Sequence, residues 1–242
     1  AAHFVEIKTF HSYCFDLLGR IGNLNEADEV VKKAAELIRQ GEVEQNRIGK
    51  TVLVIDEAQD MDKDDYDLIT ALMEANEEMR VIAVGDDDQN IFEFRGSDSR
   101  YMYSLSKTAG GRLMEMTDNY RSAQNIVDAA NDFSQRIGQR IKTTPIISTS
   151  NEKGHVKVVE HLAYDINQQP IHLYQPILNE LTAKRPQGSI CILTQTNEEA
   201  ANMLALLHKH GIKGKLIQSM DGLRFWNMAE ARYFTKCIEK GQ

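Results

Sequence analysis

Acidic side chains follow two apolar runs of this sequence, and their chemistry suits phosphate and metal binding. The run Val52–Ile55 stops at Asp56-Glu57, and the run Val81–Val84 stops at Gly85-Asp86-Asp87-Asp88-Gln89. Carboxylate oxygens suit Mg²⁺, which uses one or two protein carboxylates and fills its shell with water and phosphate. A neighbouring carboxylate such as Glu57 can accept a proton from an attacking water. Carboxylates this close repel each other unless a cation or solvent lies among them.

The elements that position these carboxylates are predicted from the same runs. Short apolar runs without alternation are typical of strands buried on both faces, as in a parallel sheet. A helix over about Asp64–Ala75 separates the two runs, which together predict a strand–helix–strand unit. Ligands bind outside the carboxyl ends of parallel strands, so both acidic groups are expected at one edge. A solvated acidic rim is the alternative for either group alone.

The remainder of the chain predicts a second α/β half, with the division near residue 115. Helices are expected over Tyr13–Leu18, Asn25–Ile38, Ile126–Ile137, about Pro170–Leu181 and Asn197–His210, with Asn197 as the cap of the last one. Strands are expected over Val156–Val159 and Ser189–Leu193, and the polar segment Thr143–Gly154 is expected to be a connector.

Composition excludes several classes of protein. The chain has 242 residues, of which 42% are apolar and 26% charged, as in ordinary globular proteins. No run approaches the ~20 apolar residues that cross a bilayer, so no membrane partner is expected. The net charge of −8 gives no overall attraction to nucleic acid, although a groove can be locally basic. Three distant cysteines favour reduced thiols and a cytoplasmic location.

Four further sequence segments accompany Asp56-Glu57 and resemble motifs of one protein family. Val54–Asp60 is similar to the second motif of the UvrD/Rep/PcrA branch of superfamily 1 helicases, and Val84–Ser97 to the third. Asn119–Val127 resembles the fourth motif, and Thr9-Phe10-His11-Ser12 resembles the short motif that precedes the second. Gly222–Trp226 is similar to a segment of the family's second motor domain. The motifs keep the family's order over most of the chain.

This resemblance implies a fold, an activity and partners. The expected fold is α/β: a partial RecA-like parallel-sheet motor domain over residues 1–115, followed by part of a second one over residues 116–242. The expected activity is that of an ATP-dependent DNA helicase or translocase, which couples ATP hydrolysis to movement on single-stranded DNA. ATP, Mg²⁺ and single-stranded DNA are the implied ligands, and a nuclease or repair protein is a further expected partner.

The resemblance also implies roles at the nucleotide. Asp56 would hold Mg²⁺, usually through water, and Glu57 would polarise the hydrolytic water. Gln89 would sense the γ-phosphate and couple hydrolysis to the DNA groove. Arg121 would place its guanidinium on the γ-phosphate, where fixed positive charge stabilises the transition state. Tyr120 would stack on the adenine.

A second set of residues is implied for DNA. Phe92 and Phe94 occupy positions of base-stacking aromatics, and stacking contributes ~1–3 kcal/mol per base whatever the sequence. Arg95 follows them, while Phe10 and His11 resemble positions that line the same groove. The family usually has Tyr and Trp with Gly between them, whereas Glu93 here adds a negative charge. Core packing is the alternative for each aromatic side chain.

These 242 residues contain no match to the phosphate-binding loop Gly-x-x-x-x-Gly-Lys-[Ser/Thr]. Gly49-Lys50-Thr51 ends like the pattern, but Glu44 stands at its first glycine, and the tripeptide precedes a strand instead of opening a helix. We expect the loop upstream of Ala1 and the last motifs after Gln242, so that this central fragment alone is inactive. Two alternatives stay open. One is a non-catalytic nucleic-acid-binding or assembly module descended from such a helicase, and the other is a Mg²⁺-dependent phosphohydrolase that uses Asp86–Asp88.

Overall fold

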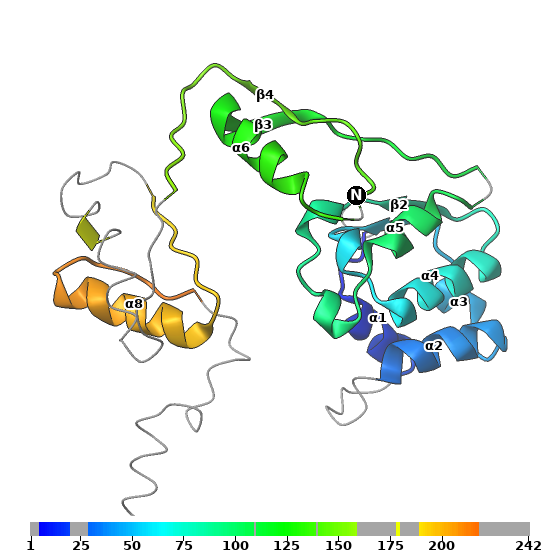
Figure 1. Ribbon diagram of the computed structural model, residues 1–242. Helices are drawn as coiled ribbons and strands as arrows, with labels where there is room; N and C mark the ends of the chain where they lie inside the picture. Colours follow the sequence, from blue (N-terminus) through cyan, green and yellow to red (C-terminus); the bar gives the residue numbers. More distant parts are fainter. Residues whose placement is uncertain are drawn as a thin grey trace, which may run out of the picture. The chain divides into compact units, whose positions relative to one another are not determined.

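The computed structural model describes residues 5–19, 29–108, 110–138, 140–158, 178–179 and 189–217 (Figure 1). The chain forms two compact units, Ala1–Lys157 and Val158–Gln242. Helices accompany two parallel pairs of strands in the first unit, which confirms the predicted α/β class. Within the described ranges, no helix has the length and apolar character that crossing a membrane requires.

The first strand pair forms the predicted strand–helix–strand unit. β1 (Val52–Ile55) and β2 (Arg80–Ala83) run parallel, and α4 (Lys63–Ala75) connects them. The backbone hydrogen bonds continue past both strands, since Val84 N–H donates to the Ile55 carbonyl and Ala58 N–H donates to the Val84 carbonyl, at 2.9 and 2.8 Å. This continuation holds the residues that follow the two strands side by side.

An apolar core lies between the helices and one face of this strand pair. The helices that contribute to it are α1 (Phe10–Leu17), α2 (Val30–Arg39), the short α3 (Gln45–Ile48) and α4. α2 buries Val31, Ala34 and Ile38, which recur at helical spacing. The predicted helices over these residues are confirmed from Val30 onward, while Asn25 and Ala27 lie outside the described residues.

The strands are buried on one face only. Leu53 and Val81 pack against the core, but Val54 and Ile82, which are opposite each other in the register, are 63% and 51% exposed. The prediction of strands buried on both faces is therefore wrong for the described residues. The helices cover one face of a two-stranded pair, and an apolar run does not show how many faces are covered.

Short helical segments follow the two strands. η3 (Ala58–Asp60) comes directly after β1, while η4 (Asp87–Gln89), η5 (Glu93–Arg95) and α5 (Ser99–Leu105) come after β2. A second buried cluster, which includes Met61, Ile69 and Leu105, holds α5 against η3 and α4. These contacts fix the loops that carry the second and third motifs.

The second strand pair contains β3 (Asp118–Ala123) and β4 (Ile147–Ser150), with α6 (Gln124–Ser134) between them in sequence. The predicted helix after Tyr120-Arg121 is confirmed, but these two residues lie in β3, which was not predicted. The predicted connector Thr143–Gly154 contains β4, so that prediction is also corrected. Ile-Ser-Thr-Ser is too polar to be recognised as a strand, because its pairing is set by the backbone and not by apolar burial.

The second unit is described mainly around α8 (Asn197–Lys209). The predicted helix is confirmed, but its cap is Thr196, whose Oγ1 accepts from Glu199 N–H at 3.2 Å. The predicted strands at Val156–Val158 and Ser189–Leu193 are wrong, since these residues have irregular structure. Val159, most of the predicted helix at 170–181 and the segment at 222–226 lie outside the described residues.

Candidate functional site

The end of β1 exposes Asp56 and Glu57. Glu57 has a left-handed backbone with φ of 52°, which is uncommon for a residue with a Cβ atom. Its N–H donates to Asp56 Oδ1 at 3.1 Å, and its carboxylate accepts from Gln59 Nε2 at 2.8 Å. Backbone conformations of this kind cost energy and are concentrated at functional sites. The turn therefore marks Glu57 as a candidate for chemistry on structural grounds.

Gln59 is a buried link between the two strand ends. Its side chain is tied to Glu57, and its Oε1 accepts from Asp86 N–H at 3.0 Å. Gln59 is 2% exposed, so both ends of its amide are used where water has little access. Sequence reasoning assigned Gln59 no role, although it stands within the second motif. Only the pairing of β1 with β2 reveals its function as a link.

Gly85 is the position where this link packs most closely. A Cβ atom there would lie 2.6 Å from Gln59 Oε1, 2.9 Å from the Gln59 nitrogen and 2.9 Å from Met102 Sδ. Real Cβ atoms do not approach other atoms so closely. Glycine at this position therefore allows the buried amide to reach the backbone of Asp86.

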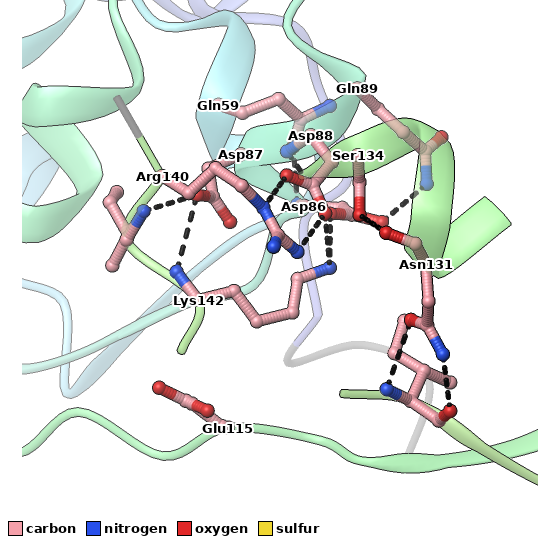
Figure 2. Close-up of polar contacts among 12 residues, drawn as sticks. Gln59, Asp86, Asp87, Asp88, Gln89, Glu115, Asn131, Ser134, Arg140 and Lys142 are labelled. Carbon is pink, nitrogen blue, oxygen red and sulfur yellow. Dashed lines mark hydrogen bonds and ion pairs between the residues drawn. The ribbon is translucent and has the colours of Figure 1, made fainter. Parts of the chain in front are cut away.

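A basic segment of the protein pairs with the aspartates that follow β2 (Figure 2). The Arg140 guanidinium binds Asp88 with two hydrogen bonds, Nε to Oδ1 at 2.6 Å and a terminal nitrogen to Oδ2 at 2.8 Å. Lys142 Nζ lies 2.7 Å from Asp86 Oδ1 and 3.2 Å from Asp88 Oδ2. The backbone N–H groups of Ile141 and Lys142 both donate to Asp87 Oδ2.

These ion pairs change the acidity of the groups involved. Burial alone raises the pKa of Asp88, but the hydrogen bond from Arg140 and the charge of Lys142 outweigh it and hold that pKa below its usual value. Burial likewise lowers the pKa of Lys142, yet Asp86 and Asp88 hold it above its ordinary value. Both partners are therefore charged at neutral pH.

The acidic group after β2 is not a metal centre in this structure. Among the described residues, no group of three or more His, Cys, Asp or Glu side chains could hold a metal ion. In this structure, Arg140 and Lys142 are the cations that lie among these carboxylates. The described contacts give no support to a phosphohydrolase that uses Asp86–Asp88, because these side chains bind Arg140 and Lys142.

Gln89 shares one carboxylate with this network. Its Nε2 donates to Asp86 Oδ2 at 2.7 Å, and the Gln89 side chain is exposed. Asp86 Oδ1 also accepts from Asp88 N–H at 3.2 Å, which caps η4. Asp86 is therefore the residue through which Gln89, Gln59 and Lys142 are connected.

The fourth motif extends from β3 into α6, and its residues Tyr120 and Arg121 face solvent. Asn119 Oδ1 accepts from the N–H groups of Arg121 and Ser122, at 3.0 and 2.8 Å, which fixes the backbone there. Arg121 is exposed, and Tyr120 is 78% exposed. Both side chains are accessible to a ligand.

Phe92, Phe94 and Arg95 form a cluster at η5. The two ring centroids are 6.3 Å apart with their planes tilted by 52°, and the guanidinium carbon of Arg95 lies 5.2 Å from one centroid and 5.5 Å from the other. Contacts between guanidinium and ring faces are attractive. Phe94 is 79% exposed, while Phe92 is half-buried, so they offer aromatic surface beside a positive charge.

The first short motif lies at the start of α1. Thr9 caps this helix, since its Oγ1 accepts from Ser12 N–H at 3.2 Å. Phe10 is half-buried and packs against both apolar clusters, whereas His11 is exposed. The motif therefore combines one side chain that anchors the helix with one that faces solvent.

Comparison with known proteins assigns nearly the whole chain to two helicase domains. The UvrD/REP helicase N-terminal domain matches residues 20–110, and the UvrD-like helicase C-terminal domain matches residues 114–238, which is more than half of the chain. The chain belongs to the UvrD/REP helicase family. The resemblance to this family is thereby confirmed.

Individual relatives agree with this family. The ATP-dependent DNA helicase Rep of Buchnera aphidicola subsp. Schizaphis graminum is 29% identical over 181 residues, which are 66% of this chain and 26% of the relative. The ATP-dependent DNA helicase PcrA of Staphylococcus epidermidis is 25% identical over 179 residues, 74% of this chain and 24% of the relative. The RecBCD enzyme subunit RecB of Haemophilus influenzae is 31% identical over 150 residues, which are 58% of this chain and 12% of the relative. The chain thus spans about a quarter or less of the length of these relatives.

The segment Gly49-Lys50-Thr51, which resembles the end of a phosphate-binding loop, lies directly before β1. Gly49 follows the short α3, and Lys50 Nζ binds Glu6 Oε2 at 2.8 Å just before β1 begins. Hydrogen bonds from Lys50 and Lys8 lower the pKa of Glu6 to about 2. Gly49-Lys50-Thr51 therefore leads into a strand, as predicted, and its lysine is used in an ion pair.

Proposed function

We propose that the protein containing this chain is an ATP-dependent DNA helicase or translocase, and that the chain supplies the central part of its motor. The proposal includes two partial RecA-like domains, residues 1–115 and 116–242. The two parallel strand pairs support it, as does the change from one family domain to the next between residues 110 and 114. Rep and PcrA, whose names describe this activity, are among the relatives.

The observation that carries the proposal is the linked edge at the ends of β1 and β2. Gln59 joins Glu57 to the backbone of Asp86, and Asp86 in turn holds Gln89. Buried or short hydrogen bonds thus hold together the residues that the proposed site needs on one side of the nucleotide. A solvated acidic rim needs no such buried glutamine.

In this proposal, Asp56 holds Mg²⁺. Asp56 is an exposed hard-oxygen donor, and Mg²⁺ commonly binds through one carboxylate, waters and substrate phosphates, so the residue fits the ion. When bound with ATP, the ion would supply neutralising charge to the phosphate oxygens. Asp56 requires no second carboxylate from Asp86–Asp88 for this role.

The protein's own residues then carry the chemistry. Glu57, held by Gln59, accepts the proton of the attacking water. Gln89 contacts the γ-phosphate, and Arg121 places a fixed positive charge on the same group as charge develops on its oxygens. Tyr120, largely exposed on β3, stacks on the adenine.

The proposed DNA surface contains Phe92, Phe94 and Arg95, together with Phe10 and His11 at the start of α1. The aromatic pair stacks on bases, which contributes ~1–3 kcal/mol per base in a sequence-tolerant way. Arg95 supplies a positive charge for the DNA backbone next to the rings, so a locally basic site is available on an acidic chain.

We also propose a protein partner and a cellular location. One relative is named as a subunit of the RecBCD enzyme, which supports the expectation of a larger assembly with a nuclease or repair protein. A cytoplasmic location, expected from the sequence, belongs to the same proposal.

ATP hydrolysis by the full-length protein, with and without single-stranded DNA, tests this function. We expect stimulation by DNA, and a loss of about 10²–10⁴-fold in turnover for Glu57→Gln, which removes the general base. Glu78→Gln, an exposed glutamate in the turn before β2, is the matched control and should hydrolyse ATP like the wild type. Turnover without any response to DNA would reject the translocase, and undiminished turnover in Glu57→Gln would reject the assigned base.

A further inference from the structure

The acidic segment Asp86–Asp88 and the basic segment Arg140–Lys142 pair in reverse order, residue by residue (Figure 2). The Arg140 side chain binds Asp88, backbone N–H groups of the basic segment bind Asp87, and the Lys142 side chain binds Asp86. The first segment lies in the region matched by the N-terminal helicase domain and the second in the region matched by the C-terminal one. The pairing therefore joins the two matched regions directly.

The Lys142–Asp88 pair is largely shielded from solvent, and the Arg140–Asp88 and Lys142–Asp86 pairs are partly shielded. The side chain of Lys142 is 12% exposed and that of Asp88 is 14% exposed. Charges in such positions are screened less by salt than surface pairs. Removal of one partner leaves an uncompensated charge, which is far more costly than the loss of a surface pair. The surrounding structure therefore depends on both segments.

The basic segment is itself fixed on its far side. The Glu115 carboxylate accepts from the N–H groups of Thr143 and Thr144, at 3.1 and 2.9 Å. Asn131 of α6 exchanges two hydrogen bonds with the backbone of Ile146, at 2.8 and 3.2 Å. Lys142 therefore reaches Asp86 from a backbone segment that separate hydrogen bonds hold in place.

Lys142 and Gln89 bind opposite oxygens of the same carboxylate. Lys142 Nζ contacts Asp86 Oδ1, while Gln89 Nε2 donates to Asp86 Oδ2. From the backbone of Asp86, a second path leads through Gln59 to the Glu57 carboxylate. The orientation of the Asp86 side chain therefore affects where the Gln89 amide lies.

We propose that Lys142 is a positioning residue for ATP hydrolysis: by holding Asp86, it sets the position of Gln89 and supports the Gln59 link to Glu57. Arg140 assists by holding Asp88 in the same segment. This inference rests on the proposed function and extends it to residues outside the helicase-like motifs recognised in the sequence. Without the ammonium group, the Asp86 carboxylate turns toward water or toward other donors, and the Gln89 amide moves with it.

The test compares steady-state ATP hydrolysis by three variants of the full-length protein. Lys142→Met should lower kcat by about 10- to 100-fold, because small displacements of positioned groups cost this much. The KM for ATP should change by less than about threefold, since the lost interaction does not contact ATP. Lys142→Arg, which keeps the charge, should retain most of the turnover. Lys63→Met breaks an exposed Lys63–Asp67 pair on α4 and should behave as the wild type.

Arg140→Met gives a second, independent variant in case Lys142→Met does not fold. It should lower kcat because Asp88 loses its paired guanidinium, whereas Arg140→Lys, which keeps the charge, should retain most of the turnover. Wild-type turnover in Arg140→Met would overturn the inference.

The outcomes separate this inference from the function on which it rests. Wild-type turnover in Lys142→Met would overturn the positioning role while the helicase proposal stands. An equal loss in Lys142→Arg and Lys142→Met would also overturn it, since a structural role alone explains that result. A wild-type protein without ATP hydrolysis would overturn the proposed function and this inference together.

Discussion

Gly85→Ala tests whether the buried amide of Gln59 organises the site. The added Cβ atom would lie 2.6 Å from Gln59 Oε1 and 2.9 Å from Met102 Sδ, so one of these groups must move. Overpacking of this kind costs about 1–3 kcal/mol. Displacement of Gln59 also breaks its hydrogen bonds to Glu57 and Asp86, at about 0.5–1.5 kcal/mol each. Together these effects predict a local destabilisation of about 2–6 kcal/mol.

Native-state hydrogen exchange, read by mass spectrometry, measures this loss directly. Peptides that cover residues 84–89 should exchange faster in Gly85→Ala by the factor that corresponds to this free energy, because local opening becomes easier. Gly138→Ala is the matched control, since a Cβ atom at Gly138 meets nothing within 4 Å. Equal exchange of residues 84–89 in the wild type and both variants would refute the role assigned to Gln59.

Two further predictions concern the DNA surface and the acid dependence of stability. Phe94→Ala should weaken single-stranded DNA binding by ~1–3 kcal/mol whatever the sequence, while Phe133→Ala, also an exposed phenyl, should leave it unchanged in fluorescence anisotropy. Equal affinities of these two variants would exclude base stacking at Phe94. Burial and the charge of Asp62 raise the pKa of Asp65 to about 6. The folded protein therefore binds this proton more tightly than the unfolded chain does. As a result, the stability of the folded state falls as pH rises from about 4 to 6. Asp65→Asn should therefore stabilise the protein by about 1–2 kcal/mol at pH 8 and by little at pH 4 in urea unfolding, and equal effects at the two pH values would contradict this.

The first half of the fold was predictable because its signals are local. Val52–Ile55 and Val81–Val84 are continuous apolar runs with abrupt polar ends, and the helix between them begins with a cap at Asp62, whose side chain accepts from Asp65 N–H at 2.9 Å. Each signal lies within a few residues of the element it predicts. Strand, helix and strand were therefore found close to their observed bounds.

Long-range features were not predictable in the same way. β4 has the sequence Ile-Ser-Thr-Ser, and its position depends on backbone pairing with β3. The partners of Asp86–Asp88 are more than fifty residues away in sequence, and nothing in Arg140–Lys142 distinguishes it from a solvated basic stretch. The aspartate run predicted a cation or solvent among the carboxylates, but electrostatics does not state whether a metal ion, water or side chains occupy that position.

The same difference between local and long-range signals applies to the residues of the candidate site. Motif resemblance predicted roles for Asp56, Glu57 and Gln89, because their residue types and spacing are specific. It did not identify Gln59 as a link, since this function exists only when the ends of β1 and β2 lie side by side. Burial of an uncharged polar side chain that contacts Glu57 and the backbone of Asp86 is the signal that reveals it, and burial is known only from the structure.

In the proposed mechanism, Glu57 acts on the water that attacks ATP and contributes little to holding ATP. Separate measurement of ATP binding and single-turnover hydrolysis, in the full-length wild type and in Glu57→Gln, tests it most directly. We expect an ATP dissociation constant within about threefold of the wild type and a rate of hydrolysis lowered by about 10²-fold or more. Hydrolysis at the wild-type rate, or a loss explained entirely by weaker ATP binding, would contradict it.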